Sequence, residues 1–188
     1  MKKFTITAAK TAGFCFGVDR AVKLVYNEIE HGFKTATLGE IIHNPTVVSD
    51  LAAKGVRVID SPADALAGEK VVIRSHGVGA DVYRELEARG IPYADGTCPF
   101  VRRIQNTAAK CSREGRTVVI MGDNTHPEVI GIAAHCENGA YVLHNDAELD
   151  AFLKKNYKNS KKKVAIMPQT TYNISTVSYT HLTLPTIA

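Results

Sequence analysis

The sequence predicts an α/β fold made of two consecutive three-layer αβα units, each with a parallel sheet between layers of helices. Short runs of apolar and β-branched residues alternate with helical patterns along the chain, which is typical of parallel strands joined by helical crossovers. A length of 188 residues and an apolar content of 45% allow one large domain or two small ones. No low-complexity linker divides the chain, so we place the join near Cys98, where a second run of strand–helix units begins.

The predicted strands are short apolar runs that end at polar or glycine-containing turns. The N-terminal run is read as a first strand, because it lacks the long apolar core of a signal peptide. In chain order the predicted strands span residues 4–8, 36–40, 56–59, 71–75, 91–95, 118–122 and 164–167.

The predicted helices lie between these strands and are bounded by capping residues. Asn44-Pro45 supplies an N-cap and a first helical residue, Ser61-Pro62 starts a brief helical turn in the same way, and Gly90 ends a helix. In chain order the predicted helices span residues 17–31, 45–54, 80–89, 99–114, 127–133 and 146–153.

The last segment, residues 174–188, does not continue this alternation of strands and helices. A helix should follow the strand at 164–167, but the segment has no charge, no helical period and many β-branched residues. We interpret it as a foreign or frame-shifted end rather than a natural C-terminus.

Composition narrows the classes of function. The formal charge of +4 fits an anionic small-molecule substrate and is too mild to indicate nucleic acid. No apolar run reaches the roughly 18 residues that span a bilayer, so we expect no membrane insertion and a cytoplasmic protein. In that reducing compartment, exposed cysteines favour metal binding or catalysis over disulfides.

Two cysteines occupy similar turns between a strand and a helix. Cys15 lies between Gly13 and Gly17, and Cys98 precedes Pro99 at a predicted helix start. Glycines let the backbone approach a bulky ligand, and a helix N-terminus stabilises a thiolate. We expect both thiols to serve a metal or redox centre. The other two, Cys111 and Cys136, fall inside predicted helices, where a small buried apolar role is expected.

Three histidines, His43, His76 and His126, follow predicted strands and stand at predicted helix starts. Ligands of open α/β sheets bind beyond the carboxyl ends of the strands, and helix N-termini bind phosphate. One histidine alone would as readily be structural. Three in equivalent turns predict a shared site that could hold a diphosphate.

Two further residues could act on a ligand held there. Glu128 lies in the first turn of the helix that follows His126, where it could deliver a proton or simply favour the helix N-terminus. Thr170 lies in the turn after the strand at 164–167 and could donate a hydroxyl hydrogen bond to substrate or to turn amides.

These motifs, taken together and in order, closely resemble the 4-hydroxy-3-methylbut-2-enyl diphosphate reductases, the IspH or LytB family. The resemblance covers residues from about 1 to 173 and no single motif would be specific alone. The matching segments are residues 12–21, 42–44, 75–78, 95–99, 126–128 and 169–171.

The resemblance implies an iron–sulfur reductase of the non-mevalonate isoprenoid pathway, which removes the substrate's allylic hydroxyl as water to give isopentenyl and dimethylallyl diphosphates. It implies a [4Fe–4S] cluster held by three cysteines, with ferredoxin or flavodoxin as electron donor. The implied roles are cluster ligation for Cys15 and Cys98, diphosphate binding for His43 and His76, a substrate-facing network for His126, and proton delivery for Glu128 with Thr170.

The family fold has three similar α/β units around the cluster, with the first strand joined to the third unit. The resemblance therefore divides this chain into a strand of the third unit (1–14), a first unit (15–97), a second unit (98–173) and the atypical tail (174–188). The family's third cluster cysteine should follow the Gln169-Thr170-Thr171 turn further on, and this chain ends before it. We hypothesise a truncated product with little or no turnover.

Two other functions stay open from the residues alone. One is a zinc-dependent hydrolase with Glu128 as general base, although the ligand spacing matches no zinc motif that we can name. The other is a non-catalytic remnant that binds a diphosphate without reducing it.

Overall fold

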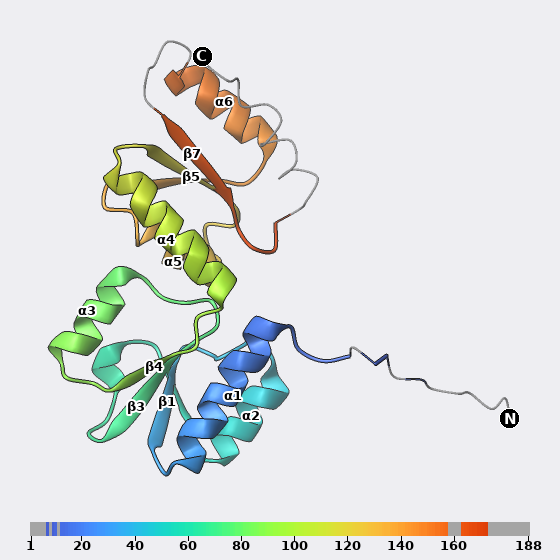
Figure 1. The fold of residues 1–188 in the computed structure, drawn as a ribbon, viewed down its shortest axis with the longest axis vertical. Coiled ribbons are helices and arrows are strands. Elements are labelled where there is room, and N and C mark those ends of the chain that lie inside the picture. Colours follow the sequence, from blue (N-terminus) through green and yellow to red (C-terminus); the bar gives the residue numbers. More distant parts are fainter. Residues whose placement is uncertain (1–6, 8, 11, 158–162, 173–188) are drawn as a thin grey trace, which may run out of the picture.

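The computed structural model describes residues 7, 9–10, 12–157 and 163–172. Apart from residue 7, the strand predicted at residues 4–8 lies outside the described residues, and so does the whole tail 174–188. The described residues form two parallel sheets, one after the other along the chain (Figure 1).

The first sheet has four parallel strands in the order β2-β1-β3-β4. Its central strands, β1 and β3, are mostly buried, which is why they read as nearly continuous runs of apolar and β-branched residues. The strand bounds are β1 (Lys34–Leu38), β2 (Arg57–Ile59), β3 (Glu69–Ile73) and β4 (Tyr93–Asp95).

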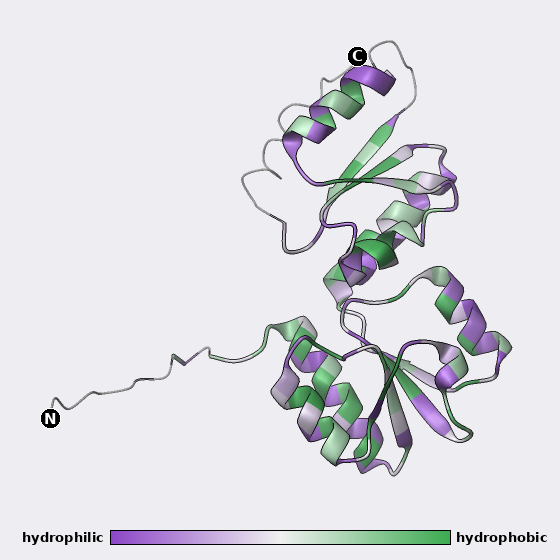
Figure 2. Ribbon diagram, turned by 180° about the vertical axis from the view of Figure 1, so that it is seen from behind, coloured by the Kyte–Doolittle hydropathy of each residue, from purple (hydrophilic) through white to green (hydrophobic). Residues whose placement is uncertain are grey.

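Helices cover both faces of this sheet. On one face, Ala21 and Val25 of α1 (Phe16–Glu30) pack with Leu51 of α2 (Pro45–Ala53) and with Val72 of β3. On the other face, Leu86 of α3 (Ala80–Ala88) packs against β1 and β3 beside the short 3-10 helix η1 (Pro62–Asp64). Apolar residues therefore recur on one side of each helix, and Figure 2 shows them alternating with hydrophilic ones along α1 and α2.

The second sheet has three parallel strands in the order β6-β5-β7. These are β5 (Thr117–Met121), β6 (Ala140–Leu143) and β7 (Val164–Pro168). One face is covered by α4 (Pro99–Arg113) and α5 (Pro127–Ala133), and the other by α6 (Asp146–Tyr157). The arrangement confirms the predicted α/β class with two successive αβα units.

Three expectations about local structure were wrong. The sequence reading missed β6, a short edge strand whose residues are half-exposed or exposed, because its apolar run of four residues is at the lower limit of strand length. Cys136 is not in a helix, because α5 ends at Ala133, although its side chain is buried in the apolar core as expected. His76 is not at a helix start, since α3 begins at Ala80.

Two predicted strands were also longer at their C-terminal ends than the strands in the structure. β1 ends at Leu38 rather than at residue 40, because Gly39 has a φ of 71° and leaves the extended conformation. β3 ends at Ile73, and Gly77, with a φ of 71°, lets the chain turn after His76. The reactive residues therefore lie in loops beyond the strands rather than on them.

The two units contact each other where the sheets end. His135, just after α5, pairs through Nε2 with the carbonyl oxygen of Val78 at 3.1 Å. A Cβ on Gly131 of α5 would lie 3.7 Å from the same carbonyl. Within the part of the chain that is described, no helix is long and apolar enough to cross a membrane.

Candidate functional site

The two cysteines occupy equivalent positions in their units. Cys15 is the N-cap residue of α1, and Cys98 is the N-cap residue of α4, which starts with Pro99. Cys15 is exposed and Cys98 is half-buried. Each cysteine therefore lies at the positive end of a helix dipole, beside the first amide groups of its helix, which have no partner within that helix.

The structure brings the two cysteine turns into contact. A Cβ on Gly17 would lie only 2.5 Å from Cys98 Sγ, so the thiol of Cys98 packs against the first turn of α1. The amide of Cys98 donates to the carbonyl oxygen of Ser75 at 2.9 Å. The segment that precedes His76 is thus joined directly to the Cys98 turn.

The three predicted histidines form one cluster. The ring centroids of His43 and His76 are 4.8 Å apart, and those of His76 and His126 are 5.4 Å apart. His43 precedes α2, His76 follows β3, and His126 is the N-cap of α5, so the cluster joins both units. The imidazoles lie beside the segment to which Cys98 is bonded.

His76 is neutral at physiological pH in this setting. Burial lowers the pKa of His76 to about 4, with smaller contributions from His43, His126 and Arg74. A neutral imidazole can still donate one N–H to an anion. A bound diphosphate would favour the charged imidazolium, so anion binding and protonation of His76 should be linked.

His126 has its tautomer set by the backbone. Its Nδ1 accepts the amide hydrogen of Glu128 at 3.1 Å and so caps α5. Nδ1 carries no proton in this arrangement, which makes Nε2 the atom that can donate to a ligand. His43 differs, since its Nδ1 lies 3.6 Å from Glu40 on the open side of the cluster.

Glu128 is buried and binds the exposed Thr170. Glu128 is 2% exposed, and its Oε1 accepts the Thr170 amide at 2.7 Å. Its Oε2 accepts the Thr170 hydroxyl at 2.6 Å. The turn after β7 therefore binds the carboxyl group in the first turn of α5.

Gln169 supports this arrangement, a role that sequence reasoning missed. Its Oε1 accepts the amide of Asp123 at 3.2 Å, and its Nε2 donates to Thr171 Oγ1 at 3.0 Å. It joins the loop after β5 to the turn after β7, which are 46 residues apart. No local pattern predicts such a bond, because it depends on the parallel pairing of β5 and β7.

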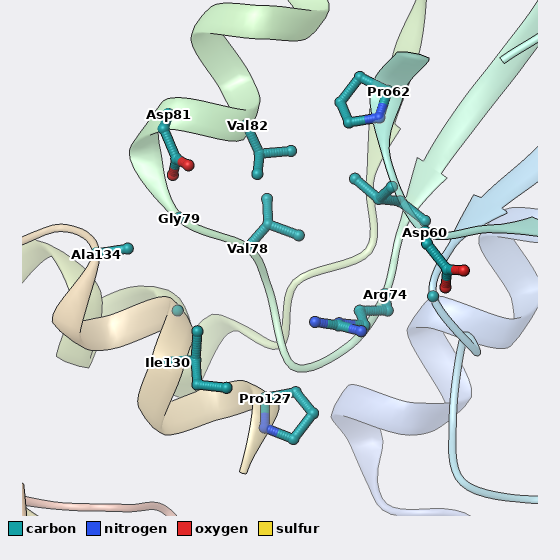
Figure 3. A pocket seen from close by; sticks show the side chains of 13 residues that line it. Asp60, Pro62, Arg74, Val78, Gly79, Asp81, Val82, Pro127, Ile130 and Ala134 are labelled. Carbon is teal, nitrogen blue, oxygen red and sulfur yellow. The ribbon is translucent and has the colours of Figure 1, made fainter. Parts of the chain in front are cut away.

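A cavity of about 200 Å³ lies between the end of the first sheet and α5. None of the predicted site residues lines it. Arg74 extends into it from the end of β3 toward Pro127 and Ile130 (Figure 3). Burial lowers the pKa of Arg74, which Asp60 partly offsets. Two carboxylates, Asp60 and Asp81, also line the cavity, so it is not a simple anion pocket.

The described residues supply an incomplete metal site. Within residues 7, 9–10, 12–157 and 163–172, no group of three or more His, Cys, Asp or Glu side chains is placed to hold a metal ion. Cys15 and Cys98 offer two ligands of the right chemistry for iron. Cys111 and Cys136 pack in the apolar core of the second unit.

The fold and the site define an α/β protein whose successive parallel-sheet units meet at a cluster of three imidazoles, with the Cys98 turn and the buried Glu128 on adjoining segments. The family model described as "LytB protein" matches residues 6–184. The chain belongs to the LytB family.

Two relatives of similar sequence have the same name. The 4-hydroxy-3-methylbut-2-enyl diphosphate reductase of Caldanaerobacter subterraneus is 46% identical over 149 residues, which are 77% of this chain and 52% of the relative. That of Alkaliphilus oremlandii is 40% identical over 182 residues, covering 95% of this chain and 61% of the relative. The chain thus spans about half to three fifths of the length of these relatives.

Solved structures of such reductases have a similar fold. One of (E)-4-hydroxy-3-methyl-but-2-enyl diphosphate reductase, described as the terminal enzyme of the non-mevalonate pathway, matches with a TM-score of 0.76 and 35% identity, covering 91% of this chain and 60% of the other. The Plasmodium falciparum reductase structure matches with a TM-score of 0.80 at 22% identity, covering 90% of this chain and 52% of the other, which supports the fold alone.

Proposed function

We propose that this chain supplies two units of a 4-hydroxy-3-methylbut-2-enyl diphosphate reductase of the non-mevalonate isoprenoid pathway. Family membership supports the reaction class. One observation carries the proposal. The Cys98 turn contacts the N-terminus of α1, and it is also hydrogen-bonded to the segment before His76. A redox centre and a diphosphate site would then be neighbours, as this substrate requires. Family membership also argues against the zinc-hydrolase alternative.

In this proposal the three histidines hold the diphosphate. His76 is the central ring of the cluster, and its neighbours approach it from both units. Because His126 Nδ1 is engaged with the backbone, Nε2–H is its donor toward the diphosphate. Protonation of His76 and His43 as the anion arrives would balance its charge.

Glu128 is the proposed proton source, with Thr170 as its partner. A hydroxyl can both donate and accept, so a proton on Glu128 Oε2 would reverse the 2.6 Å contact and make the carboxyl the donor to Thr170 Oγ1. The proton could then pass through that hydroxyl toward the leaving oxygen of the substrate.

Cys15 and Cys98 are the proposed protein ligands of a [4Fe–4S] cluster. The two thiols fit this group in chemistry, Cys98 Sγ packs against Gly17 two residues after Cys15, and a further ligand would come from outside the described residues. When bound, the cluster supplies electrons and a Lewis-acidic iron for removal of the allylic hydroxyl. Ferredoxin or flavodoxin would reduce it, in a cytoplasmic setting where the thiols stay reduced. With two thiols available, we expect this chain alone to hold the cluster weakly and to turn over slowly.

The proposed units follow the sheets. We assign residues 15–97 to the first unit and residues 98–173 to the second, with residues 1–14 contributing a strand to a third unit of such reductases. The bond from Cys98 to Ser75 and the start of α4 at Pro99 support a boundary at Cys98.

Diphosphate binding tests the proposal most directly. Inorganic diphosphate is titrated into the chain by calorimetry and compared with His76→Ala and His31→Gln. We expect His76→Ala to weaken binding by about tenfold or more, since it removes a hydrogen bond to a charged group. His31→Gln is the control, because His31 is exposed at the far end of α1 and its side chain pairs with the Asn27 carbonyl oxygen of the same helix. Equal affinity in all three proteins would contradict the proposed role of the cluster.

A further inference from the structure

The Cys98 turn, residues 95–98, is fastened to α1 by two different devices. The first is close packing. Gly17 leaves room for Cys98 Sγ, as described above, and a Cβ on Gly96 would lie 3.5 Å from the Cβ of Ala21 in α1. These contacts put the backbone of the turn directly against the helix that begins at Cys15.

The second device is the guanidinium of Arg20. Its Nη1 donates to the carbonyl oxygen of Thr97 at 3.1 Å, and its Nη2 donates to that of Asp95 at 3.2 Å. Arg20 lies three residues after Gly17 and therefore on the same face of α1. The planar fork of an arginine spans two carbonyl oxygens in a way that a lysine cannot.

The turn is also stabilised by a hydrogen bond and an ion pair that do not involve α1. The Asp95 carboxylate accepts the Thr97 amide at 2.9 Å and forms an ion pair with Arg102 of α4. Arg102 Nη2 also donates to Tyr83 Oη at 2.6 Å. These bonds stabilise the turn internally but do not reach α1. The direct contacts of the turn with α1 come from Arg20, from Gly17 and from the packing of Gly96 on Ala21.

We infer that Arg20 and Gly17 are positioning residues that set the separation of the Cys15 and Cys98 thiols. Arg20 acts through the two backbone carbonyls that precede Cys98, and Gly17 acts by admitting the Cys98 side chain against α1. The inference rests on the proposed function for the identity of the natural metal group, but the geometry it concerns belongs to the two thiols themselves.

Cadmium binding measures that geometry without substrate or turnover. The reduced, metal-free chain is titrated with Cd²⁺ under argon, and the thiolate-to-cadmium absorption in the ultraviolet is followed. The part of the signal that is lost in Cys15→Ser reports the site that uses both thiols. We expect Arg20→Ala and Gly17→Ala each to raise the Kd of that site by about tenfold or more, the range seen when groups that orient metal ligands are removed. Arg20→Lys should fall between Arg20→Ala and the unchanged chain.

Two controls separate positioning from other effects. Lys23→Met removes a charge from an exposed position on α1 whose partner is Asp19, and should leave the Kd unchanged. In the Cys15→Ser background, Arg20→Ala should not change the remaining cadmium affinity, because a single thiol has no separation to set. Equal weakening by Arg20→Ala with and without Cys15 would overturn the inference, since Arg20 would then act through charge or through the whole fold. An unchanged Kd in Arg20→Ala would overturn it as well, whether or not the chain binds diphosphate.

Discussion

The candidate site contains a half-buried imidazole, His76, and a buried carboxyl group, Glu128. Burial together with two neighbouring imidazoles lowers the pKa of His76 to about 4. Glu128 is buried and accepts two hydrogen bonds from one threonine. In the proposed site, an arriving diphosphate would change the protonation of His76, which is how a group with a shifted pKa can serve binding.

The depressed pKa of His76 predicts a loss of stability in mild acid. The unfolded chain binds a proton at this imidazole below about pH 6.5 and the folded chain only below about pH 4, so the folded state loses stability as pH falls between these values. His76 is partly solvated, so we expect no more than about 1 kcal/mol between pH 7 and pH 5. Urea unfolding of the chain and of His76→Asn at both pH values measures this difference, which the variant should lack. An equal pH dependence in both proteins would exclude His76 as its source.

The Glu128–Thr170 pair predicts a specific cost for losing the hydroxyl. Thr170→Val leaves Glu128 Oε2 buried without that partner, and should lower the free energy of unfolding by roughly 1–3 kcal/mol. Thr107→Val is the matched control, since that exposed hydroxyl donates to a carbonyl of its own helix. Urea unfolding of both variants measures the two losses. A loss no greater than the control's would contradict a stabilising hydrogen bond from Thr170 to the buried carboxyl group.

At the scale of elements, short turns decide where the reactive groups lie. Gly77 follows His76 with a φ of 71°, and a Cβ there would lie 2.6 Å from Gln105 Nε2 and 2.9 Å from Thr97 Cγ2. Gln105 itself is fully buried in α4, so the His76 turn is pressed against the helix that starts at Cys98. The histidine and cysteine turns are therefore one packed unit rather than independent loops.

Gly77→Ala should therefore lower the free energy of unfolding by more than backbone strain alone would. The control is Gly90→Ala, because Gly90 has a similar φ of 65° but no atom within 4 Å of its Cβ position. We expect Gly90→Ala to lower the free energy of unfolding by about 1 kcal/mol and Gly77→Ala by at least about 1 kcal/mol more, since a Cβ must also displace packed atoms. Urea unfolding of the two variants measures the difference. Equal losses would mean that the packing around Gly77 yields without cost.

At the scale of the whole molecule, the site exists only where the two units meet. Cys15 and His43 belong to the first unit, His126 and Glu128 to the second, and Cys98 stands at the join. The contact of His135 with Val78 and the packing of Gln105 on Gly77 hold the units together close to the site.

Iron loading should therefore depend on the cysteines of the site and not on those of the core. After anaerobic reconstitution with iron and sulfide, we expect Cys15→Ser and Cys98→Ser each to lose most of the visible absorbance and bound iron. Cys111→Ala should keep both, because Cys111 packs with the apolar core of the second unit. The measurements are the absorption spectrum and the iron content per chain. Retention of bound iron in Cys15→Ser would show that the thiols do not share a centre.

Much of this architecture was predictable from local patterns. Asn44 and Pro45 begin α2 as their capping signal indicates, and the alternation of apolar runs with helical periods predicted parallel sheets. Because parallel strands present their carboxyl ends to one edge, the positions of His43, His76 and His126 after strands predicted a common location, and the rings are in fact neighbours. The edge strand β6 was missed because its apolar run has only four residues.

The sequence by itself determined the fold class, the family and the kinds of reactive group, since these follow from local periodicity and from motifs in order. The tertiary structure alone decided which partners those groups have. The fork of Arg20 on the Cys98 turn, the bonds of Thr170 to Glu128 and the place of Gln105 beneath Gly77 join residues far apart in the chain. Such contacts depend on the packing of helices and sheets in three dimensions, which sets distances that no local pattern encodes.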